Sequence, residues 1–159
     1  MSCEQNLSLV EQINDSFREF SGEDLYAPPI LQTPYKWLHE EAPYSILAHN
    51  ISEDPHFIYA NKYALSCFKY KPVEILSLPS RLSATDLDRP ERERLLKLVT
   101  RDGIAYNYTG PRVDKYGKSF TIYDGVVWQL RNRQGKIWGQ AALFWTAQHE
   151  RPEWYPRKT

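Results

Sequence analysis

The side chains that could do chemistry are few, and their spacing excludes most catalytic and metal-binding sites. The four histidines are scattered, and no two of them stand at the spacing of a metal-ligand pair. The sequence has no glycine-rich phosphate loop, no nucleophile elbow and no paired metal motif. Asp86 and Asp88 form a carboxylate pair, but Arg89 and Arg92 stand beside it, which favours a solvated cap and salt-bridge cluster. The pattern indicates binding rather than catalysis.

Arg112 and Asp124 stand out as opposite charges in the aromatic-rich second half of the chain. An arginine can hold a planar carboxylate through two parallel hydrogen bonds, so Arg112 is a candidate for binding an anion. Asp124 with Tyr106 or Tyr108 is the one acid–base pair that an enzyme could use here. Nothing in the sequence predicts a perturbed pKa for that pair beyond the effect of burial, so we do not expect an enzyme.

The cysteines and the central histidines are best explained as ordinary structural residues. Cys3 and Cys67 do not make a disulfide framework, and reduced thiols fit a cytoplasmic protein. Cys67 has apolar neighbours in a helical pattern, which favours a small core residue over a chromophore thiol. We expect His49 and His56 to face solvent or to cap a neighbouring element.

Composition excludes several classes of protein. The 20 Lys and Arg balance the 20 Asp and Glu, so no large field of one sign should attract nucleic acid or a membrane. The polar N-terminal stretch does not look like a signal peptide, and no run of about 20 apolar residues predicts a membrane-spanning helix. A chain of 159 residues fits one domain. We therefore expect a cytoplasmic protein with no nucleic-acid or membrane partner.

The first 43 residues predict a helical extension followed by a linker. Apolar residues recur at near-helical spacing from Leu7 to Phe20, and Ser21 and Gly22 end this amphipathic pattern. Residues 25–34 contain three prolines and predict an extended linker. A short helix over residues 35–41 follows.

The next segment, to residue 103, predicts two short strands and then helices. The strands cover residues 44–48 and 57–59. Asn61 is a candidate cap for the helix that follows, and residues 72–76 add one more helical turn. A longer helix is expected over residues 90–100, with Asp88 as its candidate cap and Gly103 near its end.

The last third predicts three long strands, over residues 104–113, 119–130 and 137–145, joined by turns. The whole order indicates an α+β fold, in which a five-stranded antiparallel sheet carries short helices on one face. We assign this domain to residues 44–146. The tail from residue 147 is expected to be loose, although its aromatic and basic residues could dock on a partner.

Several motifs in this domain resemble PAS domains. Residues 57–65, Phe-Ile-Tyr-Ala-Asn-Lys-Tyr-Ala-Leu, are similar to the "YaN.aal" segment of that superfamily, and residues 68–70 to the "fGy" that follows it. More specifically, the chain resembles the PAS-related MEKHLA domain at residues 78–84, 89–94, 110–112, 127–128 and 139–142. The resemblance implies a sensory or regulatory role without a settled ligand. MEKHLA domains also form the C-terminal part of plant class III homeodomain-leucine zipper proteins. This chain has neither a homeodomain nor a zipper, so the resemblance does not imply DNA binding.

The resemblance allows the usual PAS cofactors to be tested against the sequence. In light-sensing flavin domains a reactive cysteine stands where this chain has Ser80, and a hydroxyl cannot form the same adduct. The amides that hold the flavin edge are replaced by Arg112, Ile122 and Ala141. A haem domain would need a proximal histidine on the helix at residues 90–100, which has none. We expect neither cofactor.

A PAS register would place Arg112 and Asp124 together on the concave face of the sheet, facing the helices. Such charges must pair, bind a ligand or incur a large desolvation cost. Either they form an internal salt bridge, or Arg112 grips an anionic or aromatic small molecule with Arg81 and the tyrosines. The same register turns Trp128 toward the helices. The predicted ligand-binding residues are Cys67, Phe68, Leu76, Arg81, Tyr106, Tyr108, Arg112, Phe120, Ile122, Asp124 and Val126.

The outer face of the last strand is expected to show Trp138, Gln140, Ala142 and Phe144, an apolar patch that needs cover. The N-terminal helix could cover it, from its own chain or from a partner in a homodimer. We therefore predict a sensory or regulatory module that binds a small organic ligand and acts through signalling or dimerisation. The alternative is a ligand-free protein–protein interaction module with a filled core.

Overall fold

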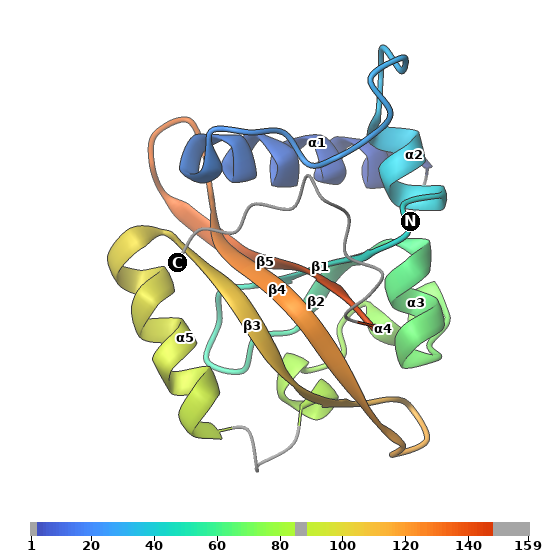
Figure 1. Cartoon of the computed structure of the whole chain (residues 1–159), viewed down its shortest axis with the longest axis vertical. Helices are drawn as coiled ribbons and strands as arrows, with labels where there is room; N and C mark the ends of the chain where they lie inside the picture. The colour runs from blue at the N-terminus through green and yellow to red at the C-terminus, as the bar shows by residue number, and fades with distance from the viewer. Residues whose placement is uncertain (1–2, 85–88, 148–159) are drawn as a thin grey trace.

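An antiparallel sheet of five strands, in the order β2-β1-β5-β4-β3, forms the centre of the protein (Figure 1). The structure is a computed structural model and describes residues 3–84 and 89–147. The predicted α+β fold is confirmed. The predicted carboxylate pair at Asp86 and Asp88, including the cap at Asp88, and the tail from residue 148 lie outside the described residues.

The predicted helices and strands are present, and their ends differ from the expected ones by one or two residues at most places. The strands are β1 Ser45–Asn50, β2 Phe57–Ala60, β3 Ile104–Val113, β4 Ser119–Arg131 and β5 Ile137–Trp145. The helices are α1 Cys3–Ser21, α2 Tyr35–Glu40, α3 Lys62–Phe68, α4 Pro72–Ile75, the 3-10 turn η1 Ser80–Ser83 and α5 Arg89–Asp102. None of the helices within residues 3–84 and 89–147 is long and apolar enough to cross a membrane.

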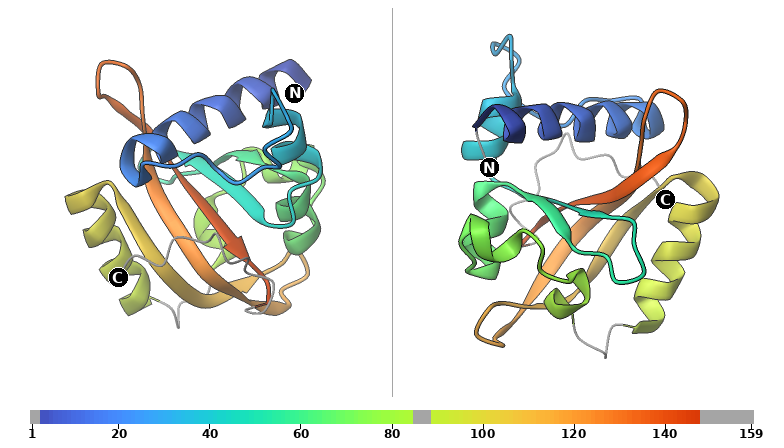
Figure 2. Two further views of the ribbon diagram at one scale, coloured as in Figure 1. Left: turned by 45° about the horizontal axis from the view of Figure 1, so that its top comes forward. Right: turned by 180° about the vertical axis from the view of Figure 1, so that it is seen from behind.

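The sheet is apolar on both faces, and different helices cover each one (Figures 1 and 2). On one face, α1 and α2 pack against the sheet to form what we call the α1-side core. In this core the rings of Phe17 and Trp128 meet edge-on, with their centres 4.8 Å apart. The sheet residues of this core are Ile46, Ala48, Tyr59, Ile104, Val126, Trp128, Leu130, Ala141, Leu143 and Trp145. On the other face, α3, α4 and α5 form the cavity-side core, whose sheet residues are Leu47, Phe57, Ala60, Ala105, Tyr108, Ile122, Val127 and Phe144.

A bulge in β4 changes which face its side chains meet. The pairing with β5 shifts register between Tyr123 and Val126, and Asp124 has a positive φ of 56°. One extra residue in a strand inverts the alternation beyond it. The prediction that Val126 and Trp128 share a face with Ile122 is therefore wrong. Both pack in the α1-side core, where the Trp128 indole N–H donates to the carbonyl of Ile13 at 3.2 Å.

Strand β3 has a matching irregularity. Its pairing with β4 shifts between Ala105 and Tyr108, and Asn107 has a positive φ of 63°. Tyr108 is buried in the cavity-side core, whereas Tyr106 packs against the α1-side core. The predicted common face for these two tyrosines is wrong for the same physical reason as in β4.

The outer face of β5 is also different from the prediction. Phe144 and Ala142 belong to the cavity-side core, and Ala141 and Leu143 face α1 instead. Of the residues predicted there, Trp138 alone packs on the α1 side. The sequence left open whether the N-terminal helix of the same chain or that of a partner covers the outer face. In the structure, α1 of the same chain covers it.

Asn61 joins the N-terminal extension, the sheet and the first helix of the cavity side. Its side-chain oxygen accepts from the backbone N–H groups of Ile46 and Ala64, both at 3.0 Å. Its amide nitrogen donates to the carbonyls of Leu38 and Tyr44, again at 3.0 Å. The residue is fully buried, and the bond to Ala64 confirms the predicted cap of α3. A primary amide can donate twice and accept twice, so this side chain is fully satisfied.

We expect Asn61→Ala to lower the free energy of unfolding by at least about 3 kcal/mol. The substitution leaves two buried N–H groups and two buried carbonyls without their partner, and each such loss costs about 1–3 kcal/mol before relaxation. Urea unfolding followed by tryptophan fluorescence measures the change.

Asn132→Ala is the matched control. The Asn132 side chain accepts from the N–H groups of Gln134 and Lys136 in an exposed turn, where water can replace it. We expect a loss of about 1 kcal/mol or less. Equal losses for the two variants would contradict the central role of Asn61.

Candidate functional site

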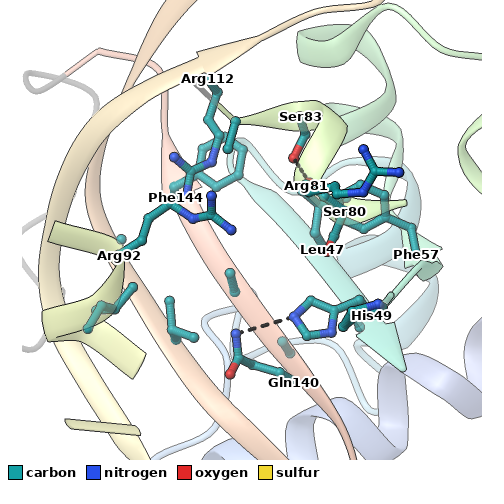
Figure 3. Close-up of a pocket in the computed structure, with 18 of the residues that line it drawn as sticks. Leu47, His49, Phe57, Ser80, Arg81, Ser83, Arg92, Arg112, Gln140 and Phe144 are labelled. Carbon is teal, nitrogen blue, oxygen red and sulfur yellow. Dashed lines mark hydrogen bonds between the residues drawn. The ribbon is translucent and has the colours of Figure 1, made fainter. Parts of the chain in front are cut away.

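A cavity of about 370 Å³ lies between the cavity side of the sheet, η1, α5 and the connection from β1 to β2 (Figure 3). Its wall is apolar over much of its area because β1, β4 and β5 present their cavity-side residues there. The main apolar lining residues are Leu47, Phe57, Leu95, Ile122, Val127 and Phe144. The prediction of a hollow between sheet and helices agrees with this position.

Three arginines from different elements reach the cavity: Arg81 from η1, Arg92 from α5 and Arg112 from β3. Arg81 is exposed at the mouth, where its Nε and Nη2 donate to the carboxylate of Asp54 at 3.1 and 3.4 Å. Arg92 and Arg112 are half-buried, and Figure 3 shows their side chains close to one another. Two of the three guanidinium groups of the lining therefore lie together on one part of the cavity wall.

The position of Arg112 depends on Tyr108 and on the bulge in β4. Arg112 Nη1 donates to the Tyr108 hydroxyl at 2.8 Å and to the carbonyl of Pro111 at 2.7 Å, and its guanidinium lies 5.0 Å from the centre of the Tyr108 ring. Tyr108 itself packs over Gly125, where a Cβ atom would come within 3.1 Å of the Tyr108 carbonyl. Glycine suits this point because a Cβ atom would be in unusually tight contact with the facing strand.

A polar pair occupies another part of the wall. His49 Nδ1 lies 2.8 Å from the carbonyl of Asn50, which can only accept, so Nδ1 carries the proton and Nε2 keeps its lone pair. The amide nitrogen of Gln140 donates to this Nε2 at 3.3 Å. Burial lowers the pKa of His49, and the charge of Arg92 acts in the same direction, while the hydrogen bond to Asn50 opposes them. The expectation that His49 faces solvent is wrong.

The structure brings together five of the predicted ligand-binding residues in this cavity: Phe68, Arg81, Tyr108, Arg112 and Ile122. Tyr106 and Val126 face α1 on the other side of the sheet, and Leu76 packs in the cavity-side core without lining the cavity.

Asp124 is also absent from the cavity lining within the described residues. It stands at the β4 bulge, where its backbone N–H donates to the Thr109 hydroxyl at 3.3 Å. The predicted meeting of Arg112 and Asp124 in one hollow is therefore wrong. The bulge takes Asp124 out of the alternation on which that prediction depended.

Two further predicted residues, Cys67 and Phe120, line a second cavity of about 360 Å³ beside α3. Lys69 and Asp114 form a 3.4 Å salt bridge there, and the Asp114 carboxylate also accepts from two N–H groups of the β3–β4 turn. Cys67 is half-buried and packs against the cavity-side core, as expected for a small core residue. Within residues 3–84 and 89–147, no cluster of His, Cys, Asp or Glu could hold a metal ion.

Arg92, His49 and Gln140 were not predicted as site residues. Arg92 stands three residues before Leu95, a spacing that puts both on one face of α5, so the helical period was sufficient to find it. His49 follows Leu47 by two residues in β1 and shares its face. Gln140 is the β5 partner of His49 and lines the cavity, so the prediction that it lies on the outer face is wrong. Only the pairing register could have corrected that assignment.

A scan against protein-family models gives one family. The model described as the MEKHLA domain matches residues 7–148, which includes α1 as well as the sheet. No curated protein sequence matches the chain.

Solved structures give the fold. The PAS domain of a protein from Colwellia psychrerythraea has 12% sequence identity and a TM-score of 0.62, and the match covers 72% of this chain and 93% of that chain. A fungal LOV domain photoreceptor has 15% identity and a TM-score of 0.59, with 87% and 91% covered. The dark structure of the blue-light photoreceptor Aureochrome1 LOV has 16% identity and a TM-score of 0.58, with 79% and 90% covered. At these identities the likeness shows the fold alone.

We expect His49→Gln to weaken the effect of acid on stability. The lowered pKa of His49 means that, below its ordinary value of 6.5, the unfolded chain binds a proton that the folded chain does not. The free energy of unfolding must then fall as the pH drops from about 6.5 toward 5, by less than about 1.4 kcal/mol per pH unit for this group.

Urea unfolding at several pH values across this interval measures the slope. Burial also lowers the pKa of His39, so the variant should keep part of the wild-type slope, and His39→Gln should remove the other part. If the free energy of unfolding of His49→Gln fell with pH as steeply as that of the wild type, burial of His49 would not lower its pKa as described.

Proposed function

Since this chain belongs to the PAS-related MEKHLA domain family, we propose that it is a sensory or regulatory module that binds a small organic anion in the cavity beneath α5. One observation supports this most strongly: two half-buried arginines, Arg92 and Arg112, reach into a largely apolar cavity of about 370 Å³. That volume lies in the range of small-molecule sites.

The charge of the cavity favours an anion. A guanidinium in a partly desolvated place raises the local positive potential, and its planar fork fits a carboxylate or a similar group. Arg81 lies exposed at the mouth beside Asp54, whereas Arg92 and Arg112 are half-buried in the cavity wall, where a bound anion would lie beside them.

The rest of the wall favours a ligand with an apolar body. Leu47, Leu95 and Phe144 offer side chains that exclude water from a bound molecule. A cavity of this kind selects small carboxylates with an aromatic or aliphatic body over inorganic anions. Arg112 is thus a ligand-binding residue in both the sequence-based prediction and the structure-based one. Arg92 is added as a second cation, and Asp124 and Tyr106 are no longer included because they do not line the cavity.

Flavin is not part of the proposal. Ser80 lines the cavity with a hydroxyl where the light-sensing domains have their thiol. Arg112 and Ile122 line it where amides would hold the flavin edge, and neither side chain can replace an amide that both donates and accepts.

Dimerisation through the outer sheet face is not carried into the proposal either. That face is filled by α1 of the same chain, with Val10 and Ile13 fully buried against it. A partner could use the face only after α1 had left it.

Native mass spectrometry of the freshly purified protein, compared with the denatured mass, tests for a retained ligand. We expect a mass increment of one small organic molecule. We also expect titration calorimetry to show binding of phenylacetate, a minimal apolar carboxylate. Arg112→Leu should weaken phenylacetate binding by at least about tenfold, because a hydrogen-bonded ion pair contributes about 1.5–3 kcal/mol.

Arg101→Leu is the control, since Arg101 is an exposed arginine of α5 that pairs with Asp102 away from the cavity. Its affinity for phenylacetate should equal that of the wild type. Equal native and denatured masses together with no phenylacetate binding would reject the proposal and favour the ligand-free interaction module.

A further inference from the structure

Gln140 has hydrogen-bonding capacity that the protein does not use. Its side chain is half-buried on the cavity wall, and within the described residues its amide makes one hydrogen bond, from Nε2 to His49 Nε2 at 3.3 Å. The amide carbonyl and the second N–H therefore have no protein partner in the described part of the chain. Such groups in a partly buried place need water or a ligand.

The tautomer of His49 fixes what the pair can recognise. Because Nδ1 donates to the carbonyl of Asn50, Nε2 can only accept while the ring is neutral. Beside it, the Gln140 amide offers one acceptor and one remaining donor. A hydroxyl group, which donates once and accepts, can satisfy this pair in a way that a hydrocarbon cannot.

The pair stands apart from the arginines across the same cavity. Figure 3 shows Arg92 and Arg112 near one another, with the hydrogen-bonded His49–Gln140 pair at a different place on the wall. Both groups nevertheless line the same cavity of about 370 Å³. A ligand held by its carboxylate at the arginines can therefore extend its other end toward the pair.

We propose that His49 and Gln140 are specificity-determining residues that select carboxylates with a hydroxyl group at the end remote from the carboxylate. This inference rests on the proposed function, because it needs the anion held at Arg92 and Arg112. It adds the ligand class: a small hydroxylated organic acid with an apolar middle. An acid without the hydroxyl would bury the Gln140 amide against hydrocarbon and lose its hydration without compensation.

Titration calorimetry with para-hydroxyphenylacetate and phenylacetate tests the selection, since these probes differ by one hydroxyl. We expect the wild type to bind the hydroxylated probe at least about fivefold more tightly, the effect of one net hydrogen bond. Gln140→Met keeps the length of the side chain and removes its hydrogen bonds. It should abolish the preference for the hydroxylated probe, and phenylacetate should bind at least as tightly as to the wild type because no unpaired amide is then buried against its ring. His49→Phe removes the partner that orients the Gln140 amide and should also abolish the preference.

Arg112→Leu gives the complementary control. This substitution should lower the affinity for both probes by the same factor, so that the ratio of the two affinities stays at its wild-type value. Urea unfolding of each variant establishes that it is folded before its affinities are compared.

The outcomes separate the two proposals. Equal wild-type affinities for the two probes, with both dependent on Arg112, would overturn the selection and leave anion binding intact. A preference that persists in the folded Gln140→Met and His49→Phe variants would also overturn it, because another group would then bind the hydroxyl. Binding of neither probe would overturn the selection, and together with equal native and denatured masses it would overturn anion binding as well.

Discussion

The bulge in β4 is the feature on which the arrangement of the protein depends. A strand in regular alternation has one set of side chains for each face along its whole length. In β4 the extra residue at Asp124 divides the strand, so that Ile122 faces the cavity while Val126 and Trp128 face α1. The large aromatic side chain of Trp128 therefore becomes part of the floor on which α1 packs. Without the inversion, the same indole would fill the space of the cavity.

The bulge also positions the polar groups of the site. Gly125 is paired with Tyr108, and the absence of a side chain there leaves room for the Tyr108 side chain close to β4. The Tyr108 hydroxyl then accepts from Arg112, which fixes one of the two cations of the cavity. Ala84, at the end of η1, forms a bridge with the backbone of Arg112 and holds the rim next to it. The bulge therefore contributes to the packing of Tyr108, which in turn contacts Arg112.

The elements could be predicted from the sequence, but the faces of the long strands could not. Local signals define the elements: the Asn61 cap, the positive φ of Gly103 after α5 and the glycine turns of the hairpins are properties of a few adjacent residues. Side chains in a strand alternate between the two faces of the sheet, so the face of each residue is predicted by counting from a residue whose face is known. One unpaired residue in the strand inverts the predicted face of every residue after it. Asp124 is a residue type that tolerates a positive φ, yet many aspartates in strands have none. Arg112 was placed correctly because the pairing from Gly110 to Val113 is regular, whereas the register shifts on both sides of Tyr108.

Covering the outer face with α1 has a mechanical consequence for the cavity. Phe20, near the end of α1, packs against Gly103 at the junction of α5 and β3, where a Cβ atom on residue 103 would overlap the phenyl ring. The guanidinium of Arg131, in β4, lies over the Phe20 ring, 4.8 Å from its centre. Helix α5 carries Arg92 into the cavity and ends at this junction, next to Phe20. Because close-packed contacts transmit displacement rather than absorb it, the two faces of the sheet are joined at this point. The end of α1 and the end of α5 are therefore in direct contact at Gly103.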